Sequence, residues 1–71
     1  MFNEYDVVRL KQDKPVDGLT TRHVGTIVMV YDANPPAYEV EFSEVDGMSL
    51  LALVTLLEDE IVLALGRPDT P

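Results

Sequence analysis

The stretch from His23 to Phe42, HVGTIVMVYDANPPAYEVEF, constrains the fold most, because it holds two strand-like runs joined by a turn with two prolines. In its second half, Tyr38, Val40 and Phe42 alternate with glutamates, which is typical of a strand with one buried and one solvated face. Its first half, Val24 to Tyr31, is rich in β-branched residues and apolar on both faces, which predicts a central strand covered on both sides. Because prolines donate no hydrogen bond to a ladder, the two runs are expected to form a hairpin.

The chain before this hairpin predicts one more strand and a long connection. Tyr5 to Lys11 has Val8 and Leu10 on one face and is expected to expose Asp6 and Arg9 on the surface. The segment from Gln12 to Gly25 is rich in polar and turn-forming residues, and a loop of this length in a small domain often has a binding role.

Three apolar or small residues of this connection have expected structural roles. Val16 and Leu19 are predicted to turn inward and anchor the loop. Gly25 is predicted to allow a sharp bend into the central strand, because glycine tolerates backbone conformations that other residues avoid.

The C-terminal part allows two interpretations. Asp46-Gly47 is a strong hairpin signal, so a strand is expected to follow it. The segment from Met48 to Leu65 contains good helix formers and Ser49 as a potential cap, but its apolar residues would surround a helix almost completely. A strand, a polar turn at Glu58-Asp59-Glu60 and a last short strand from Ile61 to Leu65 use these residues better.

These elements predict an all-β fold, a small five-stranded SH3-like barrel with an antiparallel meander and a single polar turn before the last strand. Residues 1–65 are expected to form one domain and residues 66–71 a flexible tail.

Composition excludes several classes of function. The chain of 71 residues has 13 acidic and five basic residues, a net charge of −8, which disfavours nucleic acid and acidic membranes as partners. The absence of cysteine excludes disulfides, thiolate metal sites and a cysteine nucleophile. No apolar run approaches the roughly 18 residues of a membrane span, and the N-terminus does not resemble a signal peptide, so a soluble cytoplasmic protein is expected.

No group of residues in the sequence predicts a reaction. His23 is the single histidine and has no triad-like context, so it is expected to be a surface or hydrogen-bonding residue. The acidic residues lack the spacing of a calcium loop, and no nucleophile elbow or phosphate-binding glycine run is present. We therefore expect neither an enzyme nor a cofactor or metal site.

The segments YDVVRL, HVGTIVMVY and AYEVEF, the Asp-Gly turn and LLEDEIVLAL together resemble a family of small acidic bacterial proteins known as a domain of unknown function. The resemblance spans Tyr5 to Leu65. It implies a fold similar to the SH3-like barrels of nitrile hydratase β-subunits and KOW-type modules, and a role as an accessory subunit or an antitoxin beside a larger protein. The RNA binding of KOW-type modules is not carried over, because this chain lacks their basic surface.

The leading hypothesis is a protein-interaction module that binds a larger protein or a second copy of itself. Its candidate partner-binding residues are acidic side chains and leucines, namely Glu39, Glu41, Glu44, Glu58, Asp59, Glu60, Leu51 and Leu53. Leu51, Leu53, Leu57 and Val62 are expected either to form an exposed apolar strip or to complete the core. The alternative hypothesis is a small-ligand or metal-binding module that uses the loop from Asp13 to His23.

Overall fold

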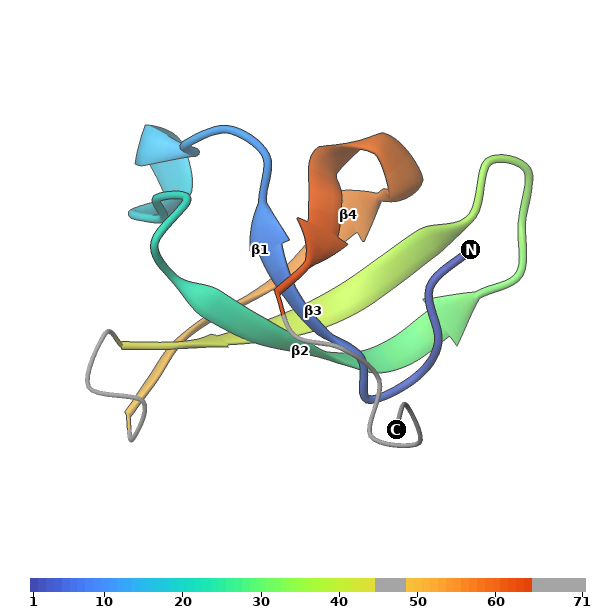
Figure 1. Cartoon of the computed structure of the whole chain (residues 1–71), viewed down its shortest axis with the longest axis horizontal. Coiled ribbons are helices and arrows are strands. Elements are labelled where there is room, and N and C mark those ends of the chain that lie inside the picture. The colour runs from blue at the N-terminus through green and yellow to red at the C-terminus, as the bar shows by residue number, and fades with distance from the viewer. Residues whose placement is uncertain (45–48, 65–71) are drawn as a thin grey trace.

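The computed structural model describes residues 1–44 and 49–64 of the chain. These residues form one antiparallel sheet of five strands and two short 3-10 helices (Figure 1). The elements in chain order are β1 (Val7–Leu10), η1 (Pro15–Asp17), β2 (Val24–Tyr31), β3 (Ala37–Ser43), β4 (Leu50–Leu57), η2 (Glu58–Glu60) and β5 (Ile61–Leu63). The predicted all-β class is therefore confirmed.

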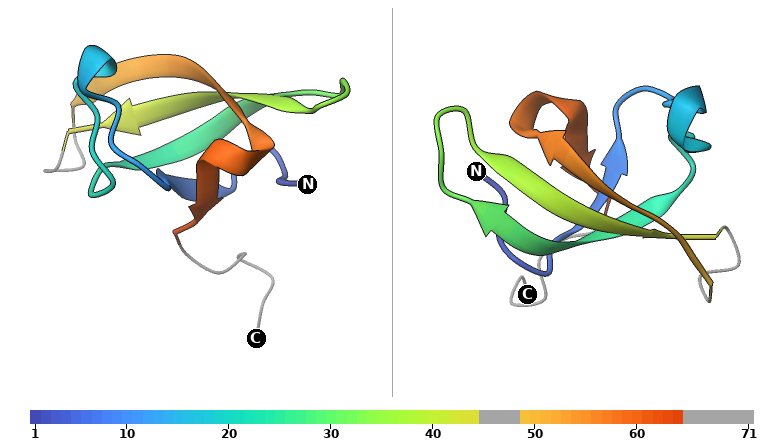
Figure 2. Two further views of the ribbon diagram at one scale, coloured as in Figure 1. Left: turned by 90° about the horizontal axis from the view of Figure 1, so that it is seen from above. Right: turned by 180° about the vertical axis from the view of Figure 1, so that it is seen from behind.

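The strands follow the order β4-β3-β2-β1-β5, so β2 is the middle strand of the sheet. The sheet curves strongly on itself (Figures 1 and 2), but among the described residues β4 and β5 are not hydrogen-bonded to each other. The predicted closure into a barrel is thus not reached through the backbone ladder.

The segment after residue 48 has the predicted strand, turn and strand, and not the alternative helix. β4 ends at Leu57, η2 makes a single turn, and β5 begins at once with Ile61. The first strand is shorter than predicted, since Tyr5 has a positive φ of 73° that a strand cannot contain. The predicted Asp46-Gly47 turn lies outside the described residues.

The inner face of the curved sheet holds the core. Its buried apolar side chains come from all five strands and the first loop, and they are Val8, Leu10, Leu19, Ile27, Tyr38, Val40, Phe42, Leu56 and Ile61. The predicted alternation in β3 is confirmed, because Tyr38, Val40 and Phe42 are all buried. Phe2 covers one end of this core with its ring edge against Tyr38, at 5.6 Å between centroids.

The expectation that β2 is covered on both faces is wrong for its second half. The pairing with β3 shifts between Ile27 and Met29, so that Ile27 and Val30 both pack toward the core while Met29 and Tyr31 face outward. A β-bulge of this kind adds one residue and exchanges the two faces of the strand beyond it. Both faces therefore look apolar in the sequence although only one is buried.

Gly25 serves close packing and not the predicted bend. It pairs with Phe42 on the inner face of the sheet. A Cβ at this position would lie 2.6 Å from Cγ1 of Val40 and 2.9 Å from the Phe42 ring. Only glycine leaves room for these two core side chains.

The loop between β1 and β2 is anchored by local hydrogen bonds. Leu19 is buried as predicted, but Val16 is 99 % exposed, because the turn of η1 directs it away from the core. Gly18 ends η1 with φ 71°, and a Lys14–Leu19 bridge closes the turn. Thr21 N–H then donates to Asp13 Oδ1 at 2.8 Å. These hydrogen bonds within the loop fix its conformation.

Asp6 also differs from the prediction, since it is buried and not solvent-facing. Asn3 N–H donates to its carboxylate at 2.9 Å, and its backbone carbonyl accepts from Ile27 N–H at 3.0 Å. Asp6 thus joins the N-terminal turn to β2.

Within the described residues no helix is long and apolar enough to cross a membrane.

Candidate functional site

The outward side of β2, β3 and β4 carries three rows of paired residues. Directly paired residues on neighbouring strands point to the same face of a sheet. The rows are Tyr31–Ala37–Leu57, Met29–Glu39–Thr55 and Thr26–Glu41–Leu53. We call these nine residues the outer face.

Large apolar side chains of the outer face are exposed on both sides of a central line of glutamates. Met29 and Tyr31 of β2 are 49 % and 41 % exposed, and Leu53 and Leu57 of β4 are 54 % and 42 % exposed. Glu39 and Glu41 of β3 lie between these two apolar borders. The strand order that produces this arrangement can be followed in Figure 2, where β3 runs between β2 and β4.

The charged side chains of the outer face are all acidic. β2, β3 and β4 contain no lysine, arginine or histidine, so no cation of these strands neutralises Glu39 or Glu41. Thr55 Oγ1 donates to the Glu39 carboxylate and orients it across β4. The first basic side chain along the sheet is Arg9 of β1, which pairs with Val24 beyond the third row.

The other predicted leucine and valine lie elsewhere. Leu51 is half-buried and packs against the core, so it does not extend the exposed border of Leu53 and Leu57. Val62 is exposed on β5, which lies at the opposite edge of the sheet from β4. The predicted strip of four residues is therefore not continuous.

The remaining predicted acids also lie apart from the outer face. Glu44 is exposed just beyond β3, while Glu58, Asp59 and Glu60 form η2 at the other end of β4. The buried Tyr38 donates its hydroxyl proton to Glu58 Oε1, and that hydroxyl also accepts from Phe2 N–H at 3.0 Å. This hydrogen bond lowers the pKa of Glu58, and burial together with the same carboxylate raises the pKa of Tyr38. Glu58 is therefore a structural partner of the core.

Glu60 has a structural role at the end of β4. Its Oε1 accepts from Leu57 N–H at 2.8 Å, and its Oε2 lies 3.0 Å from Lys14 Nζ. The backbone hydrogen bond is the main reason that the pKa of Glu60 is lowered, and Lys14 adds to it. This carboxylate joins β4 to the first loop.

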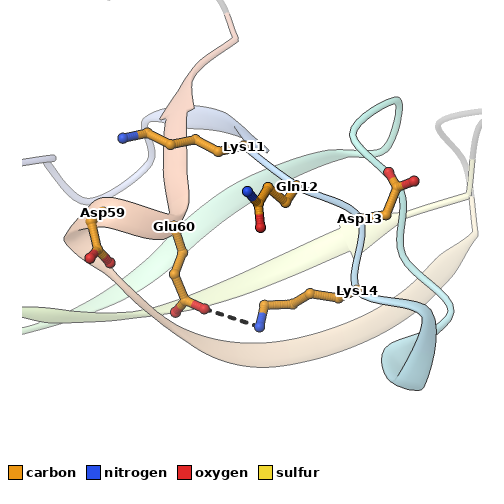
Figure 3. A pocket seen from close by; sticks show the side chains of 6 residues that line it. All are labelled: Lys11, Gln12, Asp13, Lys14, Asp59 and Glu60. Carbon is orange, nitrogen blue, oxygen red and sulfur yellow. Dashed lines mark ion pairs between the residues drawn. The ribbon is translucent and has the colours of Figure 1, made fainter.

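An open hollow of about 280 Å³ lies between the first loop and η2, lined by Lys11, Gln12, Asp13, Lys14, Asp59 and Glu60. In Figure 3, Lys14 and Glu60 face each other across it, while Asp13 turns toward the end of the loop. Asp13 and Glu60 are thus already engaged by Thr21 and Lys14. This hollow is where the alternative hypothesis of a small ligand would place its site.

The part of the chain that the structure describes contains no group of three or more residues suited to hold a metal ion. His23 is buried, and its Nδ1 accepts from Thr20 N–H at 2.9 Å. The prediction of a hydrogen-bonding histidine is confirmed, but it lies below the surface and closes the loop turn.

A family model matches residues 4–63, which is most of the chain. The chain belongs to the family of the domain of unknown function DUF4926. This confirms the resemblance to a domain of unknown function. The DUF4926 match runs from the N-terminal turn to the end of β5, so it includes the whole outer face. No curated protein matches the chain.

The sequence indicates four residues of the outer face, namely Glu39, Glu41, Leu53 and Leu57, but it does not indicate Met29 and Tyr31. The sequence predicts both in a strand that is covered on two faces, because it does not reveal the bulge after Ile27 that changes their face. A signal was present in the aromatic and thioether side chains at the end of this strand. Methionine and tyrosine are enriched at protein interfaces, whereas valine and isoleucine fill most strand cores.

Proposed function

We propose that this DUF4926 domain is a non-enzymatic protein-interaction module whose outer face binds a basic surface of a larger protein. The observation that supports the proposal is the pair of exposed apolar borders around Glu39 and Glu41, on three strands that contain no basic residue. Burial of the borders would supply affinity. The glutamates would steer a cationic partner and reject acidic ones.

The finer features of this proposal rest on topology and composition. The strand order with one 3-10 turn before the last strand supports an SH3-like architecture, although β4 and β5 are not paired among the described residues. The charge of −8 supports a basic protein as the partner. The resemblance to small acidic bacterial proteins suggests a role as an accessory subunit or an antitoxin of that partner, and we propose that the domain acts in the cytoplasm. A self-associating role is weaker, because it would bring Glu39 and Glu41 of two copies together.

The test is capture of a binding partner by the purified, tagged domain from the organism that encodes it, followed by reconstitution with the purified partner. Leu53→Ser changes an exposed apolar side chain of the outer face, and Val16→Ser makes a matched change in η1, away from that face. We expect Leu53→Ser to weaken the reconstituted complex by roughly tenfold and Val16→Ser to leave it unchanged. If the two variants weaken the complex equally, or if neither weakens it, the outer face is not the binding site.

The alternative of a ligand or metal module is separated from this proposal by a thermal-melt screen. A ligand that binds only the native state raises the melting temperature as its concentration rises. Asp13 and Glu60 already have partners within the chain, so we expect divalent cations and small polar metabolites to produce no specific shift. A saturable shift that Asp59→Asn removes would favour the hollow beside η2 as the functional site.

A further inference from the structure

We propose that the free edge of β4 takes up an extended basic segment of the partner as a sixth, antiparallel strand of the sheet. This inference rests on the proposed function and adds the mode of binding and the chemistry of the bound segment. The edge strand concerned, β4, carries no charge, proline or glycine.

β4 is a long edge strand whose pairing with β3 is irregular only between Leu50 and Ala52, so the stretch from Ala52 to Leu57 contains no bulge. It has eight residues, LLALVTLL, with no charge, proline or glycine among them. Natural sheets usually block such edges with charges, prolines, bulges or short strands, because unpaired N–H and C=O groups recruit another strand. The opposite edge, β5, has only three residues. In the left-hand view of Figure 2, β4 forms the margin of the sheet beside β3.

The hydrogen bonds show which groups of β4 point to the free side. Leu57 N–H donates to the side chain of Glu60 and therefore points away from β3. Backbone groups alternate in direction along a strand, and β3 and β4 pair without a shift from Leu57 back to Ala52. Thr55 and Leu53 thus also present N–H and C=O to the edge, and within the described residues no other backbone group hydrogen-bonds to them.

The side chains beside these free groups define the chemistry of the incoming strand. A residue paired with Thr55 would extend the row Thr55–Glu39, and one paired with Leu53 would extend the row Leu53–Glu41. Each would lie two strand spacings from its glutamate, about 10 Å. Extended arginine or lysine side chains can bridge this gap, with their apolar stems over Leu53 or Thr55 and their charged ends at the carboxylates.

These pairings predict an alternating pattern of residues in the bound segment. Residues that pair with Thr55 and Leu53 point to the outer face and should be basic, while those between them point to the inner side of the sheet edge and should be apolar or β-branched. One occupant then covers the exposed leucine and neutralises both glutamates. A second copy of this chain fits less well, because its own β4 is uncharged and each copy has a charge of −8.

The probe is a fluorescein-labelled nine-residue peptide with arginine at every second position and valine or threonine between, measured by fluorescence anisotropy at low ionic strength. One derivative is N-methylated on its arginines, whose N–H groups would face β4, and a matched derivative is N-methylated on the intervening residues. We expect the first to bind roughly tenfold more weakly and the second to bind as the parent does, because only the first loses hydrogen bonds to the edge. A peptide with glutamate in place of arginine should not bind.

Changes in the protein provide an independent measurement. Thr55→Pro removes an N–H that faces the free edge. Because this N–H, like that of Leu57, points away from β3, the strand can keep its ladder. Thr55→Val is the matched control that removes only the hydroxyl. We expect Thr55→Pro to weaken the peptide severalfold and Thr55→Val to leave it within about twofold of wild type. Glu39→Gln with Glu41→Gln should weaken it more than Glu4→Gln with Asp17→Asn, which removes equal charge elsewhere.

Four results would overturn the inference. They are equal binding of the two N-methylated peptides, no binding of the arginine peptide, equal effects of the two pairs of acid variants, and a wild-type dimer in sedimentation velocity that Thr55→Pro dissociates. If the two N-methylated peptides bind equally but Leu53→Ser weakens the reconstituted complex, the outer face remains the binding site and only strand addition is rejected. Failure of Leu53→Ser to affect the complex would instead reject the proposed function.

Discussion

Leu56 and Leu57 are neighbours in β4, but Leu56 is 1 % exposed and Leu57 is 42 % exposed. The same contrast holds from Ala52 to Leu57, where the inward residues pack against the core while Leu53 and Leu57 flank the glutamates of β3. The apolar side chains of the inner face therefore stabilise the fold. The outer face keeps equally apolar side chains in water, which a small domain has no folding reason to do.

The comparison gives a rule for substitutions in this sheet. Changes on the inner face should lower the free energy of unfolding and affect binding only through unfolding. Changes on the outer face should affect binding with little change in stability. A third group, at the junction of β4 with η2, should have intermediate effects, because it joins the core to polar side chains at the surface.

The largest effect is expected from Leu56→Ala, with Leu53→Ala as the matched change on the outer face. Leu56 is fully enclosed in the core, so its truncation should cost about 2–5 kcal/mol of unfolding free energy in urea titrations. Leu53→Ala should stay within about 0.5 kcal/mol of wild type. Similar losses for both variants would show that the two faces of β4 do not differ as described.

Gly25→Ala should have the next largest effect. The added methyl group would lie 2.6 Å from Val40 and 2.9 Å from the Phe42 ring, and both of these side chains are held in the core. We expect a loss of about 1–3 kcal/mol from overpacking, measured by urea unfolding. Gly18→Ala is a useful comparison, because it has open space and only a positive φ to oppose it. Unchanged stability in Gly25→Ala would mean that β2 and β3 approach less closely on the inner face.

The sequence predicted the elements of this fold better than their faces. The alternation of Tyr38, Val40 and Phe42 was sufficient for β3, because period two has one structural meaning in an open sheet. The apolar residues after position 48 favour strands, because a helix would expose too many of them. In both cases the pattern within one segment decides the structure.

The errors arise where structure depends on a partner segment. The bulge after Ile27 is set by the pairing of β2 with β3, so the exposure of Met29 and Tyr31 was not predictable from β2 alone. The need for glycine at position 25 likewise comes from Phe42 on the next strand. The burial of Asp6 depends on a turn with Asn3 that has no periodic pattern.

The candidate site was predicted in part for the same reason. Glu39 and Glu41 follow from the alternation in β3, and Leu53 and Leu57 from the surplus of leucines. The registers that place Leu53 beside Glu41, and Glu58 beside a tyrosine 20 residues away, join distant parts of the chain. Such pairings need the sheet order, which composition and periodicity do not contain.

Tyr38→Phe tests the contact between the core and η2 at the end of β4. The change keeps the ring in the core but removes the hydroxyl that donates to Glu58 and accepts from Phe2 N–H. We expect a loss of about 1 kcal/mol in unfolding free energy and a rise in the pKa of Glu58 toward its ordinary value, followed by NMR titration of its carboxyl carbon. Tyr31→Phe, on the outer face, is the matched control and should change neither quantity. An unaltered Glu58 titration in Tyr38→Phe would contradict the hydrogen bond.

The smallest effect is expected from Glu60→Gln, and it should depend on pH. Leu57 N–H and Lys14 hold the pKa of Glu60 below 4.5 in the folded chain, so the charged carboxylate contributes stability at pH values above 4.5. That contribution should disappear as the pH falls through the lowered pKa, because the carboxyl group of Glu60 is then protonated in both the folded and the unfolded state. The difference in unfolding free energy between wild type and Glu60→Gln should therefore be largest near neutral pH and vanish in acid.

Asp59→Asn is the control for this measurement, since Asp59 lies in the same turn and has no hydrogen bond or ion pair among the described residues. It removes the same charge, so subtracting its effect isolates the contacts of Glu60 from the general repulsion of an acidic chain. A pH-independent difference for Glu60→Gln would show that its carboxylate gains nothing from Leu57 and Lys14. The end of β4 would then be held by the core alone, and the direction of Leu57 N–H toward the free edge would lose its main support.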